Sequence, residues 1–225
     1  IHVKHQKNTA ELESVIMPVP AEVTISMSQH IGAPCKPVVK VGDTVKVGQL
    51  IGEQAGLISA PVHSSVSGTV VAVEPHTHPN KGPGILSVVI KNDGKNTLDE
   101  SVKPNKPLEE LTPDEIVEIV KEKGIVGMGG ATFPTYVKLK PGKPIDAVLI
   151  NGSECEPYLT ADHRVMLEFA DDIVFGLRAM MKAVSAPDTM PGLISGITTR
   201  QKACIQVQPR SWAASMRFRS ICRSL

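Results

Sequence analysis

The feature that most constrains the fold is a series of short alternating β runs between Val19 and Lys91, each interrupted by glycine or proline. These runs predict strands, with turns at Gly42-Asp43 and Gly48-Gln49. The predicted strands are Val38–Val41, Thr44–Val47, Gly68–Val73 and Leu86–Ile90. Many short strands at this spacing are typical of a small β-barrel or β-sandwich.

Part of this region resembles the lipoyl and biotinyl carrier domains, which are barrel-sandwich hybrids. The matching stretches are Val41-Gly-Asp-Thr-Val-Lys-Val-Gly-Gln-Leu-Ile51, Ala60-Pro61 and Ser67-Gly-Thr-Val70. In the carriers, a lysine at the tip of the hairpin between the two halves takes the cofactor. The corresponding tip here is Gly52-Glu-Gln-Ala-Gly56, which contains no lysine. We therefore expect a structural or docking domain instead of a swinging-arm carrier.

Composition excludes several other classes of function. The net charge of +1 gives no electrostatic reason to expect nucleic-acid binding. No apolar run reaches about eighteen residues, so we expect no direct membrane span, and the first residues lack the apolar stretch of a signal peptide. We predict no metal site, because the cysteines show no CxxC spacing and the loop histidines lack cysteine or carboxylate partners. These residues are Cys35, Cys155, Cys204, Cys222, His63, His76 and His78.

A second region follows a polar linker, residues 92–107, and begins with signals for a helix. Thr112 is the predicted N-cap, Pro113 takes the first helical position, and Glu115 completes a capping box. Gly124 is a natural end for this helix. Further on, the apolar run 145–150 predicts a strand buried in a parallel sheet.

One long amphipathic helix is predicted after that strand, because apolar residues recur at spacings of three and four. They are Met166, Phe169, Ile173, Leu177, Met180 and Val184. The last stretch, 186–225, is rich in proline, serine and arginine and holds no period for long. We interpret it as an irregular, non-native or disordered terminus, as after a reading-frame change. A nucleic-acid-binding tail is the alternative, and no motif supports it.

Two segments carry the functional signal. Gly127-Met-Gly-Gly-Ala-Thr-Phe-Pro-Thr135 follows the first predicted helix, and Asn151-Gly-Ser-Glu-Cys-Glu-Pro157 follows the predicted strand. Clustered glycines are useful where backbone must approach a ligand closely. The carboxyl end of a strand is where open α/β sheets bind ligands. Together the segments indicate a flavin site, and a plain glycine-rich connection is the alternative reading of a weak motif.

With both segments in view, the chain resembles the N-terminal part of the RnfC/RsxC component of the Rnf/Rsx ion-translocating electron-transport complex. The flavin subunit of NADH dehydrogenase resembles it at 127–139 and 151–157 but carries no barrel-sandwich module in front. The A subunit of the sodium-pumping quinone reductase lacks the Gly-Gly-Ala-x-Phe-Pro-Thr motif. The matching stretches are His30-Ile-Gly-Ala-Pro34, Pro37-Val-Val-Lys-Val-Gly-Asp43, Ser59-Ala-Pro-Val-His63, Ser67-Gly-Thr-Val-Val71, Gly124 to Thr135, and Ile150 to Tyr158.

The resemblance implies a mixed α+β and α/β architecture. We expect a barrel-sandwich hybrid with an N-terminal arm at 1–91, the linker at 92–107, and a truncated, Rossmann-like α/β domain for FMN and NADH at 108–185. Full-length relatives continue into a β-grasp segment and a domain with two [4Fe-4S] clusters, which we do not expect within this chain. Because those later segments complete the flavin site, weak or absent FMN binding and no enzymatic activity are expected of this chain alone.

The implied function is electron transfer in a membrane-associated NADH:ferredoxin oxidoreductase. Electrons would pass from NADH through FMN to iron-sulfur clusters, and on to ferredoxin or back from it. The implied partners are the other Rnf subunits, and the implied location is peripheral, on the cytoplasmic face of the cell membrane. The alternative is a non-catalytic docking module whose barrel-sandwich domain contacts other subunits.

The resemblance also assigns site residues, none of them catalytic. Gly127, Gly129 and Gly130 would let backbone amides lie against the flavin and its phosphate. Lys138 would compensate phosphate or flavin N1 charge, Asn151 and Ser153 would hydrogen-bond the isoalloxazine edge, and Phe133 would stack on the nicotinamide or adenine ring. Glu154 and Glu156 would help to form the nicotinamide pocket, although extended backbone points them to opposite faces. The alternatives are a surface role for Lys138 and a core role for Phe133. For Cys155 we expect a small buried apolar residue instead of a redox role.

Overall fold

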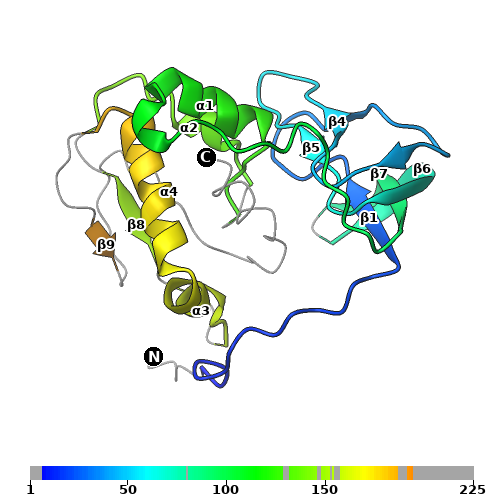
Figure 1. Cartoon of the computed structure of the whole chain (residues 1–225), viewed down its shortest axis with the longest axis horizontal. Helices are drawn as coiled ribbons and strands as arrows, with labels where there is room; N and C mark the ends of the chain where they lie inside the picture. The colour runs from blue at the N-terminus through cyan, green and yellow to red at the C-terminus, as the bar shows by residue number, and fades with distance from the viewer. Residues whose placement is uncertain are drawn as a thin grey trace.

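A computed structural model describes residues 7–79, 81–128, 132–145, 148–152, 154, 158–186 and 192–194. Figure 1 shows two lobes, with the strands β1–β7 in one and the helices α3 and α4 with β8 and β9 in the other. The helices α1 and α2 lie on the side of the second lobe that faces the strands. An extended N-terminal arm leaves β1 and runs to α3.

The strand lobe consists of two antiparallel sheets, with strand orders β1-β7-β6-β3 and β2-β4-β5. This arrangement confirms the predicted small barrel or sandwich. The long β6–β7 hairpin forms its centre, and β1 pairs with β7 along the whole of its length. The strands are β1 Glu22–Ser26, β2 Lys36–Pro37, β3 Thr44–Val45, β4 Leu50–Glu53, β5 Val62–His63, β6 Gly68–His78 and β7 Gly82–Asn92.

The turns in this lobe were predicted better than the strands. The Asp43 side chain accepts the Lys40 N–H at 2.9 Å, and Gln49 does the same for the Lys46 N–H at 2.9 Å. Each side chain folds the chain into a turn at the predicted glycine. The predicted strand Val38–Val41 is therefore wrong, because the turn already begins at Lys40. For the same reason the predicted strand 44–47 shortens to β3.

Inward-facing residues of both sheets form the core of the strand lobe. Met27, Val45, Ile51, Val70 and Ile90 have no exposed surface. The predicted linker lies along this lobe, since the Val47 N–H donates to the Thr97 carbonyl and the Asp99 N–H donates to the Val47 carbonyl, both at 2.9 Å. The chain therefore stays in contact with the strands beyond β7.

The first helix follows its local sequence code. α1, Pro113–Glu122, has Thr112 as its N-cap and a complete capping box with Glu115. Hydrogen bonds from the Thr112 backbone and hydroxyl lower the pKa of Glu115 to about 2. At the other end, Gly124 has φ +66° and the Ile125 N–H returns to the Val120 carbonyl at 3.1 Å. This is a Schellman motif, and it confirms the predicted helix end.

The predicted long helix is two helices. α3 spans Ala161–Glu168 and α4 spans Ala170–Ala183, and Phe169 between them has φ −134° and ψ 36°. Apolar residues spaced by three and four show which face of a helix is apolar. They do not show that a single residue, here Phe169, leaves the helical conformation. The remaining elements of this lobe are η1 Leu108–Glu110, α2 Thr135–Lys138, β8 Leu149–Asn151 and β9 Gly192–Ile194.

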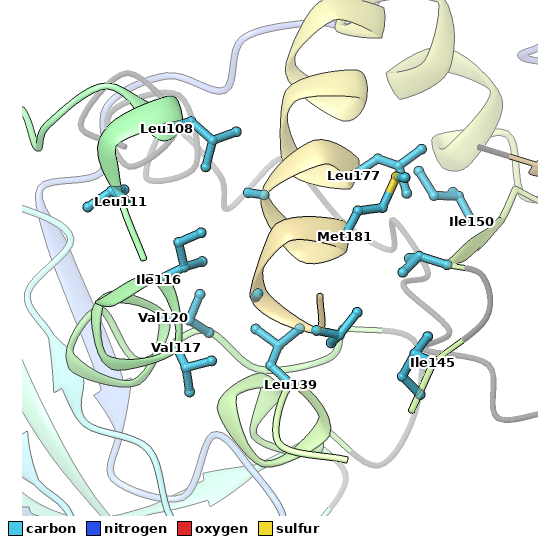
Figure 2. Close-up of a cluster of buried hydrophobic side chains, with 14 residues drawn as sticks. Leu108, Leu111, Ile116, Val117, Val120, Leu139, Ile145, Ile150, Leu177 and Met181 are labelled. Atoms are coloured by element: carbon cyan, nitrogen blue, oxygen red, sulfur yellow. The ribbon is translucent and has the colours of Figure 1, made fainter. Parts of the chain in front are cut away.

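α4 is the centre of the second hydrophobic core. Figure 2 shows Ile116, Val117 and Val120 of α1 on one side of it and Ile150 of β8 on the other. Leu177 of α4 is buried in this cluster, on the side of the helix toward Ile150. β8 pairs in parallel with β9, as predicted for a strand of a parallel sheet. The sequence therefore predicted a parallel strand and an apolar helix face in this lobe, but the strand is shorter than predicted and the helix is divided in two.

Candidate functional site

The predicted glycine segment forms a loop closed by a short antiparallel neck. The Thr135 N–H donates to the Ile125 carbonyl at 3.0 Å, and the Gly127 N–H donates to the Phe133 carbonyl at 2.8 Å. Between these two bonds, Val126 forms an isolated antiparallel bridge with Pro134. The neck is thus fixed by backbone hydrogen bonds, and we call its described residues 127, 128, 132 and 133 the glycine loop. Gly129, Gly130 and Ala131 lie outside the described residues.

Three predicted site residues come together at this neck. Lys138 is the last residue of α2, and its Nζ lies 6.0 Å from the centre of the Phe133 ring, a distance typical of a cation–π contact. A Cβ added at Gly127 would lie 3.5 Å from the same Nζ. Any side chain at residue 127 would therefore extend into the space beside the ammonium group. Glycine keeps that space open.

Lys138 differs from two other lysines of the chain in its charged neighbours. Among the described residues, no carboxylate lies within 4.0 Å of its ammonium group, whereas Lys121 and Lys106 pair with Glu118 and Glu115. Both Lys138 and Phe133 are half-buried. A half-buried cation beside an aromatic ring and open backbone suits an anionic group attached to a flat ring.

Glu154 has a different set of contacts from the one predicted. Its carboxylate accepts the Asp162 N–H at 2.8 Å and the His163 N–H at 3.4 Å, so it caps the start of α3. It also forms an ion pair with Lys7 at 3.0 Å, and only 8% of its side chain is exposed. These partners belong to α3 and to the N-terminal arm. The proposed role in a nicotinamide pocket stays a prediction.

The rest of the second motif is only partly described. The backbone of Asn151 ends β8 and pairs with Ile194 of β9. This places Asn151 at the carboxyl end of a parallel strand, where the sequence predicted it. Ser153, Cys155 and Glu156 lie outside the described residues, so their predicted roles stay predictions.

The sequence predicted an N-terminal arm but not its contacts with the region around Glu154 and α3. Lys7 also donates to the Leu159 carbonyl, and the Thr9 and Thr160 hydroxyls are 2.5 Å apart. The Ser14 N–H donates to Glu168 at 3.0 Å, and hydrogen bonds from Arg164 and Ser14 lower the pKa of Glu168 to about 2. About 150 residues separate the partners, and no local pattern predicts such contacts.

Two broader findings apply to the described part of the chain. There, no group of three or more histidine, cysteine, aspartate or glutamate residues is arranged to hold a metal ion. No helix in that part is both long enough and apolar enough to cross a membrane.

Comparison with known proteins gives two matches in the predicted order. Residues 1–95 match the family model described as the RnfC barrel sandwich hybrid domain. Residues 120–208 match the one described as the Nuo51 FMN-binding domain. The second match contains the glycine loop and β8, and it extends into the segment that we interpreted as an irregular terminus.

Several curated proteins are similar to most of this chain. The C subunit of the Na(+)-translocating ferredoxin:NAD(+) oxidoreductase complex of Acetobacterium woodii is 48% identical over 209 residues, which are 92% of this chain and 47% of the relative. The C subunit of the proton-translocating ferredoxin:NAD(+) oxidoreductase complex of Clostridium ljungdahlii is 44% identical, with 84% and 41% covered. The C subunit of the ion-translocating oxidoreductase complex of Rhodobacter capsulatus is 42% identical, with 80% and 35% covered. The chain thus spans less than half the length of these relatives.

Proposed function

Because the chain belongs to the RnfC family of Rnf-type ion-translocating oxidoreductase complexes and corresponds to the N-terminal part of its members, we propose that it binds FMN at the glycine loop. The observation that carries this proposal is the convergence of Gly127, Phe133 and Lys138 at one neck. All three lie within the segment that matches an FMN-binding domain.

The described residues fit FMN chemically. FMN carries an anionic phosphate on a flat ring system, and the neck offers a half-buried ammonium group, an aromatic ring and backbone free of side chains. Lys138 would balance the charge of the phosphate or of flavin N1, and Gly127 would leave room for the cofactor next to the ammonium. When bound, FMN accepts a hydride and can release electrons singly.

The wider function extends this proposal to the whole protein. The chain would form part of a subunit that takes electrons from NADH, or returns them to it, through FMN. Iron-sulfur clusters in the remainder of the subunit would exchange these electrons with ferredoxin. Two of the relatives are named as parts of ferredoxin:NAD(+) oxidoreductase complexes, which supports this role. Association with the cytoplasmic face of the membrane would come from the other subunits of the complex.

Titration with FMN, followed by quenching of flavin fluorescence, tests the proposal. We expect saturable quenching by the chain and a weaker affinity in Lys138→Met. Lys140→Met is the matched control, because Lys140 is an exposed lysine two residues away and should keep the affinity of the parent. Equal affinities for the two variants, or no quenching by the parent chain, would contradict the assignment of the site.

A second candidate function is a non-catalytic docking module, and the lack of a lysine at the hairpin tip favours it over a carrier. NADH oxidation with ferricyanide as acceptor, after addition of FMN, separates the docking function from the electron-entry function. Activity supports the electron-entry role. A folded but inactive chain supports the docking role.

A further inference from the structure

Two loops of the strand lobe are tied to one another and face the second lobe. We call residues 30–34 and 57–61 the two-loop platform. The Ala33 N–H donates to the Ile58 carbonyl at 3.1 Å, and the Ser59 hydroxyl donates to the Ala33 carbonyl at 3.1 Å. These bonds run in both directions between the loops. They fix the two loops as one unit.

A buried polar cluster holds the platform from inside. His30 is 1% exposed, and its Nε2 accepts the Ala60 N–H at 3.1 Å. The ring proton is therefore on Nδ1, which donates to the Ile31 carbonyl at 3.1 Å. Burial raises the pKa of the Cys35 thiol, which stays protonated and donates to the Ala60 carbonyl at 3.0 Å. A buried cluster with its hydrogen bonds satisfied makes its surroundings rigid.

The glycine loop docks on this platform through the residues on both sides of its neck. After the neck, the Tyr136 hydroxyl donates to the Leu57 carbonyl at 2.9 Å. Within the loop, the Thr132 carbonyl accepts the Ile31 N–H at 3.4 Å. Before the neck, Gly124 lies so close to the Pro61 carbonyl that an added Cβ would overlap it.

The loop needs such support, because its own structure is small. α2 has only four residues, too few for a helix to be stable by itself. Thr132 has φ +51°, a left-handed conformation that a residue with a branched side chain keeps only when its surroundings enforce it. Lys138 and Tyr136 share α2. A contact that holds Tyr136 therefore also restrains the backbone from which the Lys138 side chain extends.

We propose that the two-loop platform positions the glycine loop for its cofactor, and that Tyr136 is the positioning residue through which the barrel-sandwich lobe does so. The part of this inference that concerns FMN rests on the proposed function. The part that concerns the loop is independent of any ligand. Under this proposal, the barrel-sandwich lobe stabilises the position of a loop in the second lobe, in addition to any contacts with other subunits.

Tyr136→Phe tests the inference in the whole chain, because phenylalanine keeps the ring that packs against the core of the second lobe and removes only the hydroxyl. Tyr158→Phe is the matched control, at the other tyrosine of the chain, which is exposed. Amide hydrogen exchange is measured at Gly127, Thr135 and Ile31, whose N–H groups close the neck and join it to the platform. The loss of one hydrogen bond should raise their exchange about two- to tenfold.

We expect faster exchange at these three amides only in Tyr136→Phe, with β7 and α4 unchanged and FMN affinity reduced by a similar factor. If Tyr136→Phe gives this faster exchange but the parent chain does not bind FMN, the positioning of the loop is supported and the proposed FMN-binding function is contradicted. Unchanged exchange at the neck in Tyr136→Phe would overturn the inference, whatever happens to FMN affinity. An equal rise in β7 and α4 would also overturn it, since that pattern reports global unfolding.

Discussion

Replacement of Gly124 by alanine tests whether the two lobes are docked at the neck of the glycine loop. Gly124 has φ +66°, and an alanine Cβ there would lie less than 3.0 Å from the Pro61 carbonyl oxygen. The left-handed conformation costs an alanine about 1–2 kcal/mol. Relief of the overlap requires a backbone shift, which adds roughly 1–3 kcal/mol. The free energy of unfolding should therefore fall by roughly 2–5 kcal/mol in sum.

Gly94→Ala is the matched control for this experiment. Gly94 has nearly the same conformation, φ +71°, but an added Cβ there meets nothing within 4 Å. Its substitution should cost only the backbone term, about 1–2 kcal/mol. The difference between the two variants then isolates the overlap with Pro61. Urea unfolding, monitored by circular dichroism, gives both values.

Gly124→Ala can also relieve its overlap by separation of the lobes. In that case the decrease in the free energy of unfolding cannot exceed the free energy with which the two lobes dock. The amides of Ile31 and Thr135 should then exchange faster. If the two alanine variants lose the same free energy within about 0.5 kcal/mol and the amides of Ile31 and Thr135 exchange as in the parent, the close approach to Pro61 does not exist in solution. That result would also remove one of the contacts assigned to the two-loop platform.

Two further predictions concern the helix ends. Thr112→Ala removes the hydroxyl that accepts the Glu115 N–H and should lower the free energy of unfolding by about 1 kcal/mol, measured by thermal unfolding; Thr112→Ser should restore most of it. The Ser14 N–H contact with Glu168 should depend on pH, since Arg164 lowers the pKa of that carboxylate to about 2 from its usual value of 4.5. Because the pKa of Glu168 is lower in the folded state, its ionised carboxylate stabilises the fold above pH 4.5. This stabilisation is lost as the pH falls toward 2 and the carboxylate becomes protonated. An NMR titration of the Ser14 amide with a midpoint near 4.5 would refute the contact.

The sequence predicted those parts of the fold that depend on neighbouring residues. The capping box at Thr112 and the helix end at Gly124 are local codes, because every group involved lies within one turn of the helix. The turns at Gly42 and Gly48 are equally local, since one side chain three residues away closes each of them. Local hydrogen bonds of this kind form in the same way in most tertiary surroundings.

The same distinction between local and distant contacts applies to the predicted site residues. Gly127, Phe133 and Lys138 lie within twelve residues, and the neck and α2 bring them together. Glu154 was assigned by resemblance to a pocket, while the structure shows it as the cap of α3 and the partner of Lys7, 147 residues away. Contacts over such separations depend on how whole lobes pack. The spacing of residues within a short motif, and their preference for helix or strand, do not determine how two lobes pack.

The hairpin tip of the barrel-sandwich lobe has contacts that depend on distant residues. In the carriers, a lysine at this tip takes the cofactor. Here the tip is fastened, because Gln54 Nε2 donates to the Ser59 carbonyl at 2.6 Å and the Ala55 N–H donates to the Ser59 hydroxyl at 3.4 Å. The next residue after the tip, Leu57, accepts the hydroxyl of Tyr136. These bonds hold the tip against the loop that follows it and, through Leu57, join it to α2 on the neighbouring lobe, which is the arrangement that the proposed positioning role requires.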